Sequence, residues 1–238
     1  MTADKPGTTS RQLVLDLALR AAQGRDDFLV TPSNAAAVAM IDLYPDWPAY
    51  GMVLQGAPGS GKTHLLEVWR HAAKAGLVRM DAIGRLPPDQ LLASGALAID
   101  DAPGASLDER ALFHLLNLAR QTASHLLIAS ETDPAAWGVT LPDLASRLKV
   151  LPVARLQPPD DELLRGVIVK LFADRQLAVD EQVVSYLMIR MPRSLDAARA
   201  LVAGIDRLAL EEKSPVTRHL VARVLQQVAE PGLFPEPD

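Results

Sequence analysis

One stretch constrains this chain more than any other: residues 56–63 read Gly-Ala-Pro-Gly-Ser-Gly-Lys-Thr. The stretch matches the pattern G-x-x-x-x-G-K-[ST] at every required position. Apolar residues 51–55 precede it and are typical of a short buried strand, and residues 62–75 follow with helical spacing of their apolar side chains. In a strand, glycine-rich turn and helix, backbone N–H groups at the helix N-terminus face phosphate oxygens. The sequence therefore predicts an α/β fold that binds a nucleoside di- or triphosphate.

Several residues of this loop and the first turn of its helix have specific expected roles. Lys62 is expected to reach the β and γ oxygens, and the Thr63 hydroxyl is expected to hold Mg²⁺. The residues of this segment that are predicted to bind the nucleotide are Gly56, Pro58, Gly59, Ser60, Gly61, Lys62, Thr63 and His64.

Composition narrows the class of protein. The chain has 238 residues, 49% hydrophobic and 22% charged, which fits one large or two modest globular domains. Its net charge of −5 argues against broad attraction to a nucleic-acid backbone. Cysteine is absent, so no disulfide or thiolate metal site exists and a cytoplasmic protein is expected. The sequence shows no secretory leader and no apolar run of membrane-spanning length.

The pattern along the chain changes at Gln157-Pro158-Pro159. Before it, short apolar runs alternate with helical segments, which predicts an α/β unit with a mainly parallel sheet. Strands are expected at 51–55, 77–80, 96–100, 125–130 and 149–153, with helices near 33–43, 62–75, 87–93, 108–122 and 143–147. After it only helices are expected, near 160–175, 180–191, 194–212 and 217–229, with Asp160, Asp180, Ser194 and Thr217 as N-caps. The predicted division is a tail at 1–26, a nucleotide-binding domain at 27–156, a four-helix lid at 157–230 and a disordered tail at 231–238.

Polar side chains follow two of the predicted strands. Asp100 and Asp101 end an apolar run, where a nucleotide-bound Mg²⁺ needs a carboxylate facing the phosphate loop. Asp100 is expected to hold the ion, and Asp101 to act as base or to orient water; the alternative is that both are solvated turn residues. Ser130, Glu131 and Thr132 follow the fourth strand, and one of them is expected to sense the γ-phosphate or position water. Turn chemistry is the alternative for this tip.

These motifs, in this order and followed by an all-helical region, resemble the AAA+ ATPases. More narrowly, the chain resembles the clade of the bacterial replication initiator DnaA and its shorter relative Hda. The resemblance rests on Gly-Lys-Thr-His-Leu at 61–65, Ile-Asp-Asp at 99–101, Ser-Arg-Leu at 146–148, and Arg193 followed by Leu195. It covers about residues 25–230 and implies a lid closing over an adenine nucleotide, ADP or ATP, with Mg²⁺.

The resemblance also implies roles for individual residues. Arg147 matches the arginine finger, which acts on a neighbouring subunit's nucleotide, and Arg193 matches the lid arginine that contacts phosphates in the same subunit. Without the resemblance, each would more simply be a surface arginine. Phe28, Leu29 and Asn34 match the entry motif that lines the adenine pocket. The initiator's basic DNA-binding domain has no counterpart before Asp238, so DNA contact is expected only indirectly.

A short peptide near the N-terminus resembles the sliding-clamp-binding peptide of Hda-type proteins. It comprises Gln12, Leu13, Leu15 and Leu17, with Asp16 departing from the usual residue. An extended peptide of this kind inserts alternating leucines into an apolar groove. The alternative is the first turn of an amphipathic helix at 11–22 that packs on the body of the protein.

The resemblance therefore implies a negative regulator of replication initiation. It would bind the sliding clamp and present Arg147 to ATP held by DnaA, with its own ATP turnover left open. A homodimer or larger oligomer is a further possible assembly. One rival is a stand-alone, self-assembling or helicase-loader-like ATPase, which would need a nucleic-acid surface. The other is a nucleotide-gated adaptor without a hydrolytic role. None of the three readings involves a membrane.

Overall fold

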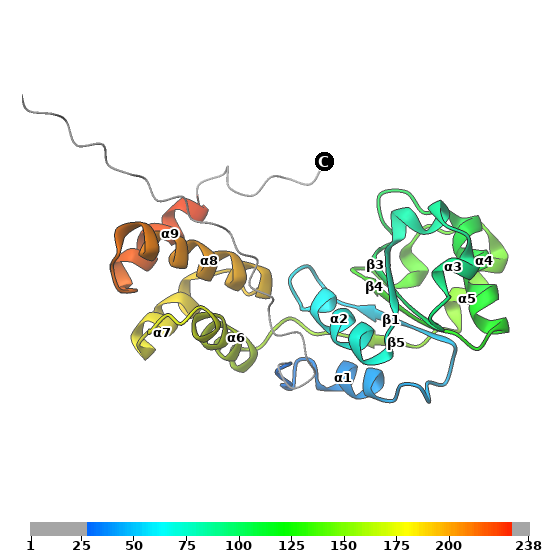
Figure 1. The fold of residues 1–238 in the computed structure, drawn as a ribbon, viewed down its shortest axis with the longest axis horizontal. Helices are drawn as coiled ribbons and strands as arrows, with labels where there is room; N and C mark the ends of the chain where they lie inside the picture. Colours follow the sequence, from blue (N-terminus) through cyan, green and yellow to red (C-terminus); the bar gives the residue numbers. More distant parts are fainter. Residues whose placement is uncertain (1–27, 230–238) are drawn as a thin grey trace, which may run out of the picture.

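A parallel five-stranded sheet lies among helices α1 to α5, in one of the two bodies of the molecule (Figure 1). The structure, a computed structural model, describes residues 28–229. The strand order is β2-β3-β4-β1-β5, with bounds β1 Gly51–Gln55, β2 Gly76–Arg79, β3 Ala96–Ala102, β4 His125–Ser130 and β5 Val153–Arg155. Helical crossovers join the strands, as parallel pairing requires. The predicted α/β fold with a parallel sheet is confirmed.

Helices cover both faces of this sheet. They are α1 Ala35–Asp42, α2 Lys62–Ala73, α3 Pro88–Leu91, α4 Glu109–Gln121 and α5 Pro142–Lys149. Along β3, Leu97 and Ile99 join the core under α3, α4 and α5, whereas Ala96 and Ala98 join the core under α1 and α2. Successive strand residues point to opposite faces, so a sheet covered on both sides needs continuous apolar runs. This is why the strands lack polar alternation.

Four further helices follow the sheet and have a core of their own. They are α6 Asp161–Asp174, α7 Glu181–Arg190, α8 Leu195–Glu212 and α9 Arg218–Ala229. Their core contains residues between Leu163 and Val224 only. The side chains of Asp160, Asp180 and Ser194 accept hydrogen bonds from the third backbone N–H that follows each, and Thr217 does the same for Leu220. The four predicted N-caps are confirmed.

The fifth strand lies later than predicted. The sequence indicated 149–153, whereas α5 extends to Lys149 and β5 begins at Val153. Leu151 donates its backbone N–H to Leu148 in a turn, and both side chains are buried although neither belongs to a strand. The apolar run that predicted a strand at 149–153 therefore belongs to the end of a helix and the turn after it.

Two predicted features lie outside the described residues: the peptide at 12–17 and the C-terminal tail at 231–238. Within residues 28–229, no helix is long and apolar enough to cross a membrane.

Candidate functional site

The phosphate loop joins β1 to α2 through two glycines with left-handed backbone conformations. Gly59 has φ of +67° and Gly61, the N-cap of α2, has φ of +99°. Side chains rarely adopt this region, so the loop requires glycine there. Lys62 folds back over the loop and donates to the carbonyl oxygens of Gly56 and Ala57, at 2.9 and 3.0 Å. The hydroxyl of Ser60 is buried in the loop and finds no hydrogen-bond partner in the described part of the chain, which fits a site that takes a polar ligand.

Thr63 and the acidic end of β3 meet beside this loop. The Thr63 hydroxyl donates to Asp100 Oδ2 at 3.2 Å, so a hydroxyl and a carboxylate converge on one point. Hydroxyl and carboxylate oxygens are ligands that Mg²⁺ prefers on a bound nucleotide. Within the described residues no cluster of three or more His, Cys, Asp or Glu side chains forms a separate metal site. The donor set therefore fits an ion held jointly with phosphates.

A bulge directs Asp101 differently from Asp100. Ile99 pairs with Ile128 and Ala102 pairs with Ser130, so β3 carries one extra residue at this point. Asp101 takes φ of +62°, and its carboxylate lies 2.5 Å from Arg79 Nη2. A first cavity, the phosphate cavity, lies beside the phosphate loop and is lined by Arg79, Asp100 and Asp101. Arg79 was not identified from the sequence. Strain at a strand tip is common where a side chain must be aimed at a ligand.

At the tip of β4, Ser130 and Glu131 face different surroundings. The Ser130 hydroxyl is buried, donates to backbone carbonyl oxygens, and accepts a hydrogen bond from the Trp137 ring. Its hydrogen bonds lie within the protein, although Ser130 is at the cavity wall. Glu131 lies 4.0 Å from Lys62 Nζ. Of the three candidate residues at this tip, Glu131 is the one whose side chain forms an ion pair with the phosphate loop. The role predicted for Ser130 stays a prediction.

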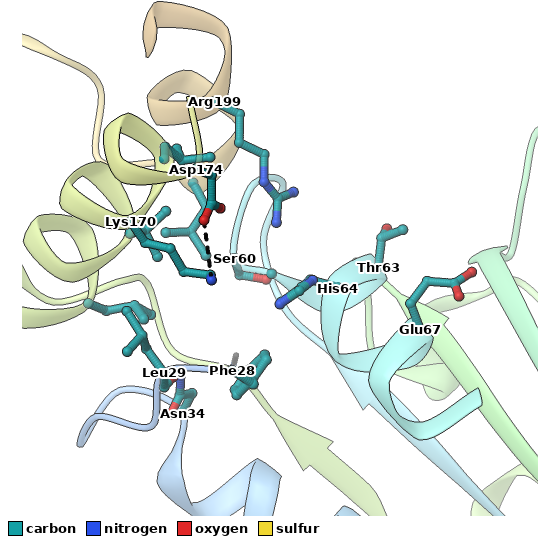
Figure 2. Close-up of a pocket in the computed structure, with 15 residues that line it drawn as sticks. Phe28, Leu29, Asn34, Ser60, Thr63, His64, Glu67, Lys170, Asp174 and Arg199 are labelled. Carbon is teal, nitrogen blue, oxygen red and sulfur yellow. Dashed lines mark hydrogen bonds and ion pairs between the residues drawn. The ribbon is translucent and has the colours of Figure 1, made fainter. Parts of the chain in front are cut away.

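A second, mainly apolar cavity of about 330 Å³ adjoins the phosphate loop (Figure 2). The Phe28 and His64 rings stack at its wall, with centroids 5.4 Å apart. Leu29 and Asn34 also line it, and their predicted contact with the base stays a prediction. The Asn34 side chain is buried and makes hydrogen bonds with the backbone of Leu29 and Thr31. It therefore stabilises the turn at residues 29–34, the entry turn. A mainly apolar cavity with a stacked aromatic wall beside a phosphate loop fits a nucleobase.

The opposite wall of this cavity comes from the helical lid. Leu163, Val167 and Leu171 of α6 line it, together with Lys170 and Asp174, whose charged atoms lie 3.6 Å apart (Figure 2). The cavity therefore lies between the sheet domain and the lid. A ligand there contacts both.

Two arginines near the start of α8, Arg193 and Arg199, lie in different surroundings. Arg193 Nη2 lies 2.7 Å from Asp161 Oδ1, and Arg193 lines neither cavity. Arg199 lines both cavities and extends from α8 toward the beginning of α2 (Figure 2). Leu195 and Arg199 are four residues apart and share one helix face. The sequence contains this spacing. It points to Arg199 only once the contact of Leu195 with the phosphate loop is known.

Arg147 lies away from both cavities. It lines a separate hollow with Tyr50, which immediately precedes β1, and Arg120 of α4. The phosphate loop begins after the other end of β1, about 16 Å away for five residues at 3.3 Å each. The structure therefore does not bring Arg147 to the nucleotide site of its own chain.

Solved structures share this architecture. Domain III of the Thermotoga maritima replication initiation protein DnaA aligns with a TM-score of 0.73 at 20% identity, covering 88% of this chain and 98% of that one. AMPPCP-bound DnaA from Aquifex aeolicus aligns at 0.63 and 19%, covering 82% and 68%. The Thermotoga maritima RuvB Holliday junction branch migration motor aligns at 0.65 and 15%, covering 88% and 72%. No protein-family model matches the chain. The chain shares its fold with DnaA domain III and with RuvB.

Proposed function

We propose that this chain binds ADP or ATP with Mg²⁺ between its sheet domain and its lid. Two DnaA neighbours of the same fold are described as bound to AMPPCP, an ATP analogue. In this chain Lys62 and the loop glycines suit the phosphates, and the Phe28 and His64 walls suit the base. Thr63 and Asp100 would hold Mg²⁺, which supplies charge neutralisation for the phosphates.

The proposed role is negative regulation of replication initiation. The chain would dock on the sliding clamp through Gln12, Leu13, Leu15 and Leu17 and present Arg147 to ATP held by DnaA. The observation that carries this proposal is the position of Arg147, at the opposite end of β1 from its own phosphate loop. A guanidinium placed there is suited to the nucleotide of another subunit. Such a group stabilises the charge on the γ-phosphate as water attacks phosphorus and ADP leaves.

The test measures ATP hydrolysis by the DnaA of the same organism, mixed with this protein and clamp loaded on DNA. Arg147→Ala should lower the stimulation of hydrolysis by about 10³-fold or more, the range known for arginine fingers. Lys149→Ala, an exposed cation on the same helix, serves as the control and should stimulate like the unaltered protein. Equal stimulation by the two variants would reject Arg147 as the finger and favour the adaptor.

Clamp docking has its own measurement. A chain lacking residues 1–18 should lose saturable binding to the clamp while keeping its nucleotide affinity, because the phosphate loop begins at residue 56. Retained clamp binding by the truncated chain would remove residues 12–17 from the proposal.

A self-assembling ATPase is the second candidate function. Thr63, Asp100 and Asp101 form an acidic site at its own phosphate loop, and Arg147 could serve a second copy in the same way as it serves DnaA. Hydrolysis that rises steeply with protein concentration, or with single-stranded DNA, and without DnaA would favour this candidate.

A further inference from the structure

A hollow of about 470 Å³ is lined by residues along α4 and α5 and by Tyr50, next to the start of β1. Two arginines line it: Arg120 from the last turn of α4 and Arg147 from the last turn of α5. Cations in last turns commonly complement the helix dipole. That general role explains their charge but not why both side chains border one hollow.

Neither guanidinium is neutralised within residues 28–229. No ion pair or hydrogen bond joins Arg120 or Arg147 to another described side chain. Asp143 also borders the hollow, one helical turn before Arg147, yet the two make no ion pair. The hollow therefore presents two positive charges and one negative charge, a net attraction for an anion.

Tyr50 adds a buried polar atom to the same hollow. Its hydroxyl is buried and has no hydrogen-bond partner within residues 28–229. Burial raises the pKa of Tyr50, while the positive charges of Arg147 and Arg120 act on it in the opposite direction. Both guanidinium groups therefore lie close enough to affect this phenol. An unpaired buried hydroxyl is costly, and because Tyr50 borders the hollow, an oxyanion that enters it far enough to reach this hydroxyl would accept a hydrogen bond from it.

We propose that Tyr50, Arg120 and Arg147 together form one binding site for the phosphate chain of a nucleotide held by another protein subunit. This deepens the proposed function and rests on it: Arg120 is a second phosphate-binding cation, and Tyr50 is a positioning donor. The planar guanidinium matches phosphate oxygens with two parallel hydrogen bonds. Arg120 would hold phosphate oxygens, which leaves Arg147 to the charge that develops at the γ-phosphate.

The rim of the hollow fits a covering protein. Val150 is 63% exposed and Phe113 is partly exposed beside the two arginines. Apolar side chains beside two positive charges are typical of a surface that another protein covers, because exclusion of water strengthens each charge interaction. A free anion would gain nothing from such a rim. The second subunit therefore supplies both the phosphates and the cover.

The first experiment uses ATP-loaded DnaA with clamp on DNA and compares four variants of this protein. Arg120→Ala should lower stimulated hydrolysis by about 10²-fold, with Arg120→Lys intermediate because it keeps the charge but loses the planar fork. Tyr50→Phe should lower it by roughly tenfold, the effect of one hydrogen bond to a charged group. Arg110→Ala, an exposed arginine of the same helix, is the matched control and should act like the unaltered protein.

Tyr50→Phe also separates function from folding. Because the hydroxyl is buried and unpaired, its removal should leave the thermal midpoint unchanged or raise it, while hydrolysis falls. A fall in both would mean that Tyr50 acts through the fold. Stimulation by Arg120→Ala equal to that of Arg110→Ala, with Arg147→Ala inactive, would overturn the joint site and leave the arginine finger intact.

A second experiment does not depend on DnaA. Inorganic tripolyphosphate is titrated calorimetrically into the Lys62→Ala protein, whose own phosphate loop is disabled. We expect saturable binding that weakens at least about fivefold in the Arg120→Ala double variant and strengthens in the Asp143→Asn double variant. No binding, or equal binding in all three proteins, would overturn the anion site. If DnaA is not stimulated at all, this result still decides the hollow separately from the proposed function.

Discussion

Arg193 and Arg199 stand near the start of the same helix but reach different partners. Arg193 precedes the N-cap Ser194 and pairs with Asp161 at the start of α6. Arg199 lies one turn into α8, four residues after Leu195, whose N–H bonds to the Gly59 carbonyl of the phosphate loop. The docking of Leu195 thus turns Arg199 toward the site. Sequence resemblance pointed to Arg193, because a motif gives the order of residues and not the face that a docked helix presents.

Substitution of each arginine by alanine tests which of the two contacts the nucleotide. Arg199→Ala should weaken ATP binding by about tenfold or more, the effect of one lost hydrogen bond to a charged group. Arg193→Ala should change it by less than about twofold, because its partner is an exposed carboxylate. Equilibrium titration with a fluorescent ATP analogue measures both. The reverse order of the two effects would return the phosphate contact to Arg193.

At the scale of elements, features within one contiguous segment were predictable. The strand, loop and helix around residues 51–73 follow from a local pattern, as do the four N-caps of the lid. The bulge that separates Asp100 from Asp101 was not predictable, because it depends on the register between β3 and β4. Likewise, the internal bonding of Ser130 depends on Trp137, which reaches it through a later turn. Contacts between elements, and not composition, decided these cases.

Asp160 links two elements and gives a prediction with a pH dependence. Its Oδ1 accepts from Leu163 N–H and its Oδ2 from Ser33 N–H, so it caps α6 and ties that helix to the entry turn. Asp160→Ala should lower the free energy of unfolding by about 1–2 kcal/mol at pH 7. Asp180→Ala, the cap of α7, is the control, since the Asp180 side chain caps its helix at Val183 without reaching the entry turn. Urea unfolding measures both variants.

The sign of the pH effect follows from the carboxylate. Hydrogen bonds to the ionised form, first that from Leu163 N–H, lower the pKa of Asp160 below its ordinary value of 3.8. A lowered folded-state pKa stabilises the protein above the unfolded-state value, and this contribution is lost as pH falls through the folded-state pKa. The gap between the unaltered protein and Asp160→Ala should therefore stay constant from pH 7 to about pH 5 and narrow below about pH 4. A gap unchanged at pH 3 would contradict this account.

At the scale of the molecule, few polar contacts join the sheet domain to the lid. Leu195 N–H bonds to the Gly59 carbonyl at 2.8 Å, and Asp160 and Gln157 both bond to Ser33. The mainly apolar cavity that Phe28 and His64 border lies between the same two bodies. A nucleotide there would add contacts to both, so we expect binding to stabilise their relative position by mass action.

Gly59 provides the sharpest test of this coupling. Its φ is +67°, and an added Cβ would lie 2.0 Å from the Ser194 hydroxyl, so Gly59→Ala combines backbone strain with a collision against the N-cap of α8. Gly95→Ala is the matched control, because Gly95 has φ of +79° but nothing within 4 Å of an added Cβ. Both variants should lose about 1–2 kcal/mol of unfolding free energy through strain. Only Gly59→Ala should also displace α8, weaken ATP binding by about tenfold or more, and increase amide hydrogen exchange at the start of α8. Equal nucleotide affinity in the two variants would show that the nucleotide site does not depend on contact between the phosphate loop and the lid.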